Sequence, residues 1–264
     1  MLRPHSFGLA LSLVLSLLLG VAPAAAQSVE SIVTDMRAQY ERQLETVDSY
    51  ILETNLYTAY HRKVMQNGSP TYQTQTRMKG EGTTSFASNT TPSAAYGLQF
   101  DRLIQHATYG GTETINGTRC HILRVDDPSK VDPNVGEQAT QMTYYVDAER
   151  SLPARMVMQT APSQQQGPEP SSVTINFLNY TTTDGLTLPH RMEIQLATNI
   201  SDAQRQQMQQ MMKQMEQLPA QQRKQMEKMM GNQMDMMKQM MSGEPIVIEV
   251  QSVRVNTEIP DGIF

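Results

Sequence analysis

The pattern of apolar positions divides the chain into one amphipathic helix and a long series of strands. Apolar residues from Val29 to Leu44 recur at the spacing of one helix face, and Ser28 stands where an N-cap is expected. From Val47 onward the apolar period falls to two, which is typical of strands that bury one face. A short helix is expected within Tyr96–Tyr109. The expected strands are Tyr50–His61, Tyr72–Lys79, Thr112–Ile115, Arg119–Val125, Thr140–Asp147, Leu152–Thr160, Ser172–Tyr180, Leu188–Thr198 and Ile246–Asn256.

The segment Ser201–Ser242 departs from the strand pattern. It holds twelve of the chain's twenty methionines, and nearly all its other residues are polar or charged helix formers. The methionines recur at helical spacing on both sides of Pro219, a residue that suits the first turn of a helix. We expect two amphipathic helices, at about 201–217 and 219–241, inserted between the last two strands. Helices of this kind have little stability alone and need a surface to pack against.

Three roles for these methionines remain open. They fill the seam between helices and sheet, or they form an adaptable apolar surface for a lipid or acyl chain, because unbranched thioethers repack around ligands of different shape. The third role is binding of Cu(I) or Ag(I), for which thioether sulfur is a soft ligand. The candidate ligand-binding residues are Met208, Met211, Met212, Met215, Met226, Met229, Met230, Met234, Met237 and Met241. The alternative metal ligands are Met211, Met212, Met215, Met226, Met229 and Met230.

Residues 1–26 have the composition of a secretory signal peptide. An apolar run from Leu9 to Val21 follows Arg3 and ends in small residues with an Ala-x-Ala cleavage pattern at Ala26. The run is shorter than the roughly 20 apolar residues that span a bilayer. We therefore expect an exported, soluble, periplasmic protein whose residues 27–264 form one domain, with 201–242 as its insertion.

Charge and cysteine content exclude some partners and bonds. Without Arg3 the chain has 20 basic and 26 acidic residues, a net charge near −6, which argues against a nucleic-acid partner. Cys120 is the only cysteine, so no intramolecular disulfide can form.

The familiar enzyme motifs do not occur in the sequence. There is no nucleophile elbow, zinc-protease helix, phosphate-binding glycine loop or C-x-x-C pair. Cys120 and His121 are consecutive in an expected strand and so face opposite sides of the sheet, which argues against a catalytic pair. The isolated histidines His61, His106 and His190 are expected to be ordinary strand or surface residues. We expect a protein that is not an enzyme and needs no cofactor.

Turn motifs along the second half of the chain carry a family resemblance. They lie within Gly111–Leu123, Tyr144–Arg155, Phe177–Arg191 and Asn256–Phe264. Over roughly residues 110–264 the chain resembles the LolA-like superfamily of outer-membrane lipoprotein carriers and sorting proteins. The resemblance implies a half-open antiparallel β-barrel with an apolar concave side, closed by helices around a lipid or acylated chain. It also implies a basic residue near the N-terminal helix that holds the lid, for which both Arg37 and Arg42 are present.

Together the pattern and the resemblance lead to one expected function. We expect a mainly β (α+β), half-open barrel that acts as a periplasmic carrier or binding protein for a lipid or acylated lipoprotein, held between the sheet and the methionine helices. A membrane-associated donor or acceptor is a possible partner, and the protein is expected to be a monomer. The alternatives are a soft-metal binding protein and a sensor that reads lipoproteins and regulates a partner.

Overall fold

The structure, a computed structural model, describes residues 27–66, 68–79, 85–86, 99–132, 135, 138–161, 171–197, 206, 210 and 243–264. The expected signal peptide, residues 1–26, lies outside the described residues. The same holds for the two helices expected within residues 201–242, where only Gln206 and Gln210 are described. No helix in the described ranges is long and apolar enough to cross a membrane.

The N-terminal helix α1, Val29–Thr46, forms where the sequence predicts it. The Ser28 hydroxyl accepts the backbone N–H of Ser31, and the Ser31 hydroxyl oxygen accepts the backbone N–H of Ser28, which completes a capping box. The helix ends at Val47, whose backbone is extended. Its buried stripe includes Ile32, Val33, Met36 and Leu44, so one face of α1 packs on the rest of the chain.

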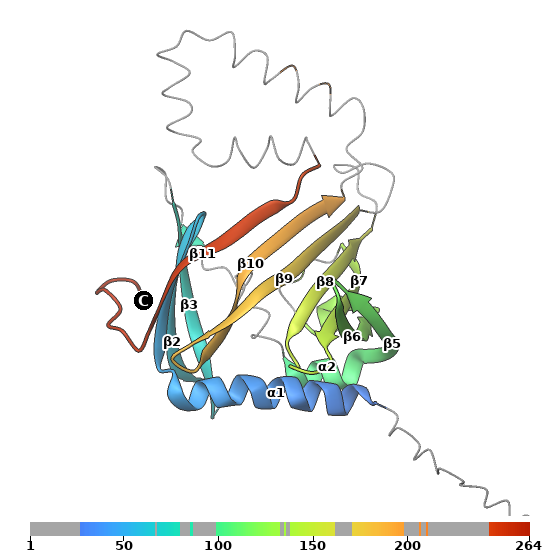
Figure 1. The fold of residues 1–264 in the computed structure, drawn as a ribbon, viewed down its shortest axis with the longest axis horizontal. Coiled ribbons are helices and arrows are strands. Elements are labelled where there is room, and N and C mark those ends of the chain that lie inside the picture. The colour runs from blue at the N-terminus through green and yellow to red at the C-terminus, as the bar shows by residue number, and fades with distance from the viewer. Residues whose placement is uncertain are drawn as a thin grey trace, which may run out of the picture.

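In the described residues, eleven strands form a single antiparallel sheet in the order β4-β3-β2-β1-β11-β10-β9-β8-β7-β6-β5. Among these strands, the end strands β4 and β5 are not paired with each other, so the sheet is open. The sheet curves around an interior, and α1 runs across its lower end (Figure 1). This confirms the expected mainly β, half-open antiparallel barrel. The strands are β1 Ser49–Thr54, β2 Tyr57–Gln66, β3 Ser69–Met78, β4 Ser85–Phe86, β5 Ala107–Ile115, β6 Thr118–Val125, β7 Ala139–Asp147, β8 Pro153–Thr160, β9 Ser171–Thr183, β10 Leu186–Ala197 and β11 Ile246–Val255.

The described part of the chain has two short helical elements besides α1. Two of its hairpin turns contain residues whose backbone is in the left-handed conformation. α2 is Phe100–His106 and the 3-10 turn η2 is Pro128–Lys130. The turns Asn116-Gly117 and Asp184-Gly185 have positive φ at both residues, as two-residue hairpins between twisted strands require. The Asn116-Gly117 turn joins the expected strands as the antiparallel β5–β6 hairpin.

The expected single strand Tyr50–His61 is wrong, because two strands and a turn occupy this stretch. The Thr54 hydroxyl accepts the backbone N–H groups of Leu56 and Tyr57 at 3.1 and 3.0 Å, and it donates to the Tyr57 carbonyl at 3.0 Å. These local hydrogen bonds reverse the chain between β1 and β2. The apolar residues around the turn continue the alternating strand pattern, so the sequence gives no sign of the turn.

The short helix expected within Tyr96–Tyr109 is confirmed as α2. Residues 100–106 are α2, and Ala107–Tyr109 already belong to β5. The register of β5 shifts between Tyr109 and Thr112, where Gly111 has a φ of +94°. A glycine bulge of this kind lets the strand continue through a bend that the sequence pattern does not indicate.

The strands β10 and β11 are antiparallel neighbours, with Met192 opposite Ile248 and Ile194 opposite Ile246. The chain between them therefore leaves and re-enters the sheet at adjacent strands. The methionine segment belongs to this connection.

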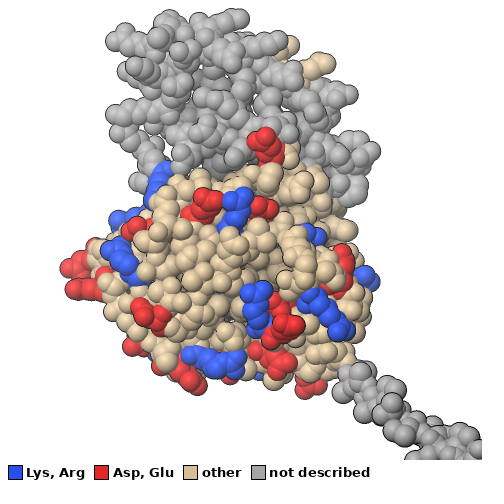
Figure 2. Space-filling model, in the orientation of Figure 1, with Lys and Arg blue, Asp and Glu red and all other residues tan. Residues whose placement is uncertain are grey.

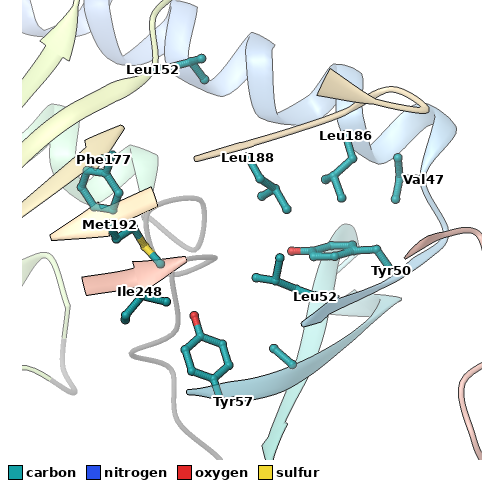
Figure 3. Packing of buried hydrophobic residues seen from close by; sticks show 11 residues of the cluster. Val47, Tyr50, Leu52, Tyr57, Leu152, Phe177, Leu186, Leu188, Met192 and Ile248 are labelled. Carbon is teal, nitrogen blue, oxygen red and sulfur yellow. The ribbon is translucent and has the colours of Figure 1, made fainter. Parts of the chain in front are cut away.

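Two clusters of buried apolar side chains occupy the interior. We call the first the covered cluster, because α1 and α2 contribute to it; it consists of Ile32, Val33, Met36, Leu103, Leu123, Val125, Val131, Met142, Tyr144 and Val146. We call the second the wall cluster, because it comes almost entirely from strands; it consists of Val47, Tyr50, Leu52, Tyr57, Ala59, Leu152, Phe177, Leu186, Leu188, Met192 and Ile248 (Figure 3).

The outer face of the sheet carries charged side chains, whereas its inner face is apolar. Acidic and basic side chains are interspersed over the visible face (Figure 2). On β10 and β11, Arg191 forms ion pairs with Glu193 at 2.9 Å and with Glu249 at 2.6 Å. The curved sheet therefore separates a charged outer face from an apolar inner wall.

Candidate functional site

The inner wall of the barrel is a continuous apolar surface across several strands. Strand pairing places Leu52 opposite Ala59, and Met192 opposite both Ile248 and Phe177. Because side chains alternate along a strand, every second residue faces this wall. The labelled side chains of the wall cluster come from β1, β2, β9, β10 and β11 and from the loop residues Val47 and Leu152, and they gather on one side of the sheet (Figure 3).

Half-buried apolar side chains extend the wall cluster. They pack against its buried members but are not themselves fully enclosed. Among them are Met78, Met156, Ile175, Ile194 and Val250. Since exposed apolar surface of this kind favours contact with another apolar group, the wall can accept a hydrocarbon chain.

Five buried polar atoms have no hydrogen-bond partner among the described residues. They are Nε2 of Gln43, the hydroxyl of Tyr57, Nε2 of His61, Oγ1 of Thr76 and Nε2 of His190. Gln43 belongs to the buried stripe of α1, and the other four are on strands. A buried polar group without a partner destabilises a protein by about 1–3 kcal/mol. The interior is therefore apolar but carries hydrogen-bonding capacity that this part of the chain leaves unused.

His61 is the most enclosed of these groups. Its ring is fully buried and stacks on the ring of Tyr50, with centroids 4.0 Å apart and planes 10° apart. Its Nδ1 lies 2.9 Å from the Thr74 hydroxyl oxygen, which leaves Nε2 as the unpaired nitrogen. Burial lowers the pKa of His61 to about 3, so the ring is neutral at ordinary pH. Burial also raises the pKa of Tyr57, which keeps its hydroxyl protonated as a donor.

The two basic residues that the resemblance offers as a latch have different surroundings. Arg37 on α1 donates a hydrogen bond to the Asp101 carboxylate on α2 at 2.5 Å. Its guanidinium also lies over the ring of Phe100, 5.7 Å from the ring centre. Arg42 bonds only Gln39 of its own helix in the interactions that the structure gives. Arg37 is therefore the residue of the two that ties α1 to α2.

A pocket with a volume of about 320 Å³ lies at the ends of the β5–β6 and β7–β8 hairpins, against β9. Its buried acid, Asp147, accepts the backbone N–H groups of Glu149 and Arg150 at 2.9 and 3.0 Å and the Arg150 side chain at 2.6 Å. Burial alone would raise the pKa of Asp147, but these hydrogen bonds outweigh burial and lower it. The carboxylate is satisfied within the hairpin, so it acts as a structural group.

The ten methionines that the sequence offers as ligand-binding residues, Met208 to Met241, lie outside the described residues, as do the six alternative metal ligands among them. Their role stays a prediction. In the described ranges, no group of three or more His, Cys, Asp or Glu side chains is arranged to hold a metal ion.

The other chemical expectations concern β6. Cys120 and His121 are consecutive strand residues, as expected, and Cys120 is a buried free thiol. Burial raises the pKa of Cys120, which keeps the thiol protonated and unreactive. His121 contacts Tyr109 instead, with 3.4 Å between Nδ1 and the Tyr109 hydroxyl oxygen.

Sequence reasoning missed the polar groups of the inner wall. It treated His61 and His190 as ordinary histidines and gave Tyr57 and Thr76 no role. The available signal was the period of two in Tyr57-x-Ala59-x-His61, which places two polar side chains on a face that is otherwise apolar.

No family model matches the chain, and no curated protein matches it. The chain is similar to several solved structures at low sequence identity. A DUF1329 family protein from Desulfovibrio piger is 11% identical, with a TM-score of 0.43, over 89% of this chain and 96% of that one. A putative outer membrane lipoprotein-sorting protein domain from Vibrio parahaemolyticus is also 11% identical, with a TM-score of 0.43, over 88% and 94%. A LolA superfamily protein from Nitrosomonas europaea is 12% identical, with a TM-score of 0.40, over 90% and 98%.

Two of these three names are those of the protein group that the turn motifs resemble. Identities of 11–12% and TM-scores below 0.5 transfer no ligand and no residue role to this chain. Its function therefore has to be argued from its own geometry.

Proposed function

We propose that the protein is a non-enzymatic periplasmic carrier or binding protein for a lipid or an acylated lipoprotein segment. The observation that carries this proposal is the apolar inner wall of an open sheet, extended by half-buried apolar side chains. Burial of an acyl chain there contributes about 0.8 kcal/mol per CH₂ group before the entropic penalty of association. A chain of ten methylenes contributes about 8 kcal/mol in this way, against an association penalty of about 4–15 kcal/mol.

The edges of the sheet support access to this wall. The end strands β4 and β5 are unpaired with each other, so the barrel has an open side. None of the eleven buried members of the wall cluster lies within α1 or α2. From α1, only the half-buried Tyr40 packs against this cluster among the described residues.

We further propose that the methionine segment contributes the opposite side of the ligand site. It belongs to the connection between β10 and β11, and these strands carry Ile194 and Ile246 at a paired position. Flexible thioether side chains suit a surface that accepts acyl chains of different length. The residues assigned to this contact are Met208, Met211, Met212, Met215, Met226, Met229, Met230, Met234, Met237 and Met241.

The first test is a change of charge on the wall. Ile194→Asp introduces a carboxylate beside the proposed acyl chain, and we expect binding of a synthetic triacylated lipopeptide to weaken at least tenfold. The matched control is Gln195→Asp, one residue along β10 and on its exposed side. Equal effects of the two substitutions would argue against a ligand on the inner wall. Native mass spectrometry of protein from its own periplasm identifies the natural ligand.

Soft-metal binding is the second candidate, and the methionine content of residues 201–242 favours it. Metal coordination requires sulfur, whereas exchange of Met for Leu in an apolar contact usually destabilises by under about 1.5 kcal/mol. Replacement of Met208, Met211, Met212, Met215, Met226, Met229 and Met230 by Leu should preserve lipopeptide binding. Submicromolar Cu(I) affinity that the wild type has and this variant lacks would place metal binding ahead of lipid binding.

A further inference from the structure

Three of the unpaired polar groups lie around one small residue of the inner wall. The register of β2 and β3 places Ala59 directly opposite Thr76. Tyr57 and His61 are two positions away from Ala59 on either side and therefore share its face, at spacings of roughly 7 Å along the strand. All four residues are more than nine-tenths buried. Ala59, which lies between the larger polar neighbours, has only a methyl side chain and is fully buried.

Each of the three groups can donate a hydrogen bond. The hydroxyls of Tyr57 and Thr76 have no partner within the described residues, and neither does Nε2 of His61. When the Thr74 hydroxyl donates to Nδ1 of His61, the neutral ring carries its proton on Nε2. Three neutral donors on one apolar surface suit an uncharged oxygen acceptor better than an anion or a cation.

Neighbouring polar groups show that the wall can satisfy its own hydroxyls. Thr54 is fully buried nearby on β1, and its hydroxyl makes three hydrogen bonds within the β1–β2 turn. The Tyr72 hydroxyl on β3 donates to the Val47 carbonyl at 2.8 Å. Phe and Val would fill the places of Tyr57 and Thr76 without an unpaired group. Packing alone therefore gives no reason for the unpaired hydroxyls of Tyr57 and Thr76.

We propose that Tyr57, His61 and Thr76 form a polar subsite that hydrogen-bonds the carbonyl oxygen of the ligand's acyl group. The inference rests on the proposed carrier function and narrows its ligand class to acyl esters and amides, as distinct from plain hydrocarbon. The chain of the ligand lies on the wall cluster, and its carbonyl group lies over Ala59. When the ligand binds, the unpaired donors form hydrogen bonds with its carbonyl oxygen.

The test uses a double variant on β2 and β3 and a matched control on β2. Tyr57→Phe with Thr76→Val removes the two hydroxyls and keeps the shape of the wall. The control, Tyr60→Phe with Thr58→Val, removes the same two chemical groups from β2 positions that alternate with the wall residues. The probes are methyl hexadecanoate and heptadecane, which have the same number of carbon atoms, and both are delivered from a cyclodextrin complex.

We expect the wild-type protein to prefer the ester by tenfold or more in dissociation constant. The double variant should lose this preference while its affinity for heptadecane stays within twofold, and its melting temperature without ligand should be unchanged or higher. The control variant should keep the preference. A double variant that retains the preference, or one that loses affinity for both probes equally, overturns the subsite. Wild type that binds both probes equally refutes the subsite alone, whereas binding of neither probe refutes the carrier function as well.

Discussion

The covered cluster and the wall cluster belong to the same sheet but are built differently. Four of the ten buried residues of the covered cluster come from α1 and α2, namely Ile32, Val33, Met36 and Leu103. The wall cluster has eleven buried residues and none from within a described helix. The unpaired buried groups of Tyr57, His61 and Thr76 lie on strands β2 and β3, and Tyr57 is itself a member of the wall cluster.

Under the proposed function, this difference separates the residues that stabilise the fold from those that bind the ligand. A helix packed on a sheet closes a core in which shape complementarity decides stability. The wall cluster takes none of its buried members from a described helix, and we propose that its half-buried apolar side chains contact another molecule. The comparison leads to predictions in which the two regions respond differently to similar changes.

The largest effect is expected from truncation in the covered cluster. Leu103 is fully buried between α2 and the sheet, so Leu103→Ala should lower the free energy of unfolding by about 2–5 kcal/mol. Ile194→Ala, at a half-buried position beside the wall cluster, should lower it by about 1 kcal/mol or less. Urea denaturation measures both. Similar losses in the two variants would mean that the wall is as closed as the covered core.

A pH-dependent effect of similar order is expected from His61. Its pKa is about 3 in the folded protein, and about 6.5 is usual for an unfolded chain. Between these values the unfolded state binds the extra proton, so stability is complete above pH 6.5 and falls as the pH is lowered towards 3. From pH 6.5 to 4.5 the loss is roughly 2–3 kcal/mol.

The measurement is the difference in unfolding free energy between wild type and His61→Phe across this pH range, because other groups titrate in both proteins. The wild type should lose more stability on acidification than the variant does. His106→Gln, a change at an exposed histidine on α2, is the control and should follow the wild type. Parallel curves for wild type and His61→Phe would show that His61 is not buried as a neutral ring.

A satisfied buried polar group should respond in the opposite way to an unpaired one. Asp147→Asn weakens three hydrogen bonds in the β7–β8 hairpin and should destabilise the protein by about 1–3 kcal/mol. Tyr57→Phe removes an unpaired hydroxyl and should leave stability unchanged or raise it. Glu149→Gln, at the exposed neighbour of Asp147, controls for charge. Thermal unfolding of the three variants decides whether the two kinds of polar group differ.

The smallest effect is expected at the contact between the helices. The Asp101 side chain is 81% exposed, so Asp101→Asn should change stability by less than about 1 kcal/mol through loss of the Arg37 ion pair. Salt screens exposed charges, so the difference from wild type should shrink between low and high ionic strength. A large, salt-independent loss in urea denaturation would mean that the pair does more than join two exposed side chains.

The sequence predicts the elements of this fold better than its site. Alternation locates most strands to within a few residues because each strand buries one face. It fails at the β1–β2 turn, where the Thr54 hydroxyl forms the turn inside an apolar stretch. It also gives no sign that β11 lies between β1 and β10, since pairing of distant strands depends on the whole barrel.

The site was harder to predict for a different reason. Tyr57 and Thr76 look like ordinary strand residues, and their importance comes from the lack of a partner, which only the three-dimensional arrangement shows. The methionines of residues 201–242 are conspicuous in the sequence, but spacing alone does not distinguish packing, acyl-chain contact and metal binding. Position in the fold carries more information here than composition.

The most direct test of the account is to locate a bound acyl chain by nuclear magnetic resonance. Isotope-filtered spectra detect short contacts between unlabelled methyl hexadecanoate and labelled methyl groups of the protein. The account predicts contacts to the methyl groups of Ile194, Ile248 and Val250 on the wall, and none to those of Leu123 and Val146 in the covered cluster. Contacts to the covered cluster, or none to the wall at saturating ligand, would contradict it.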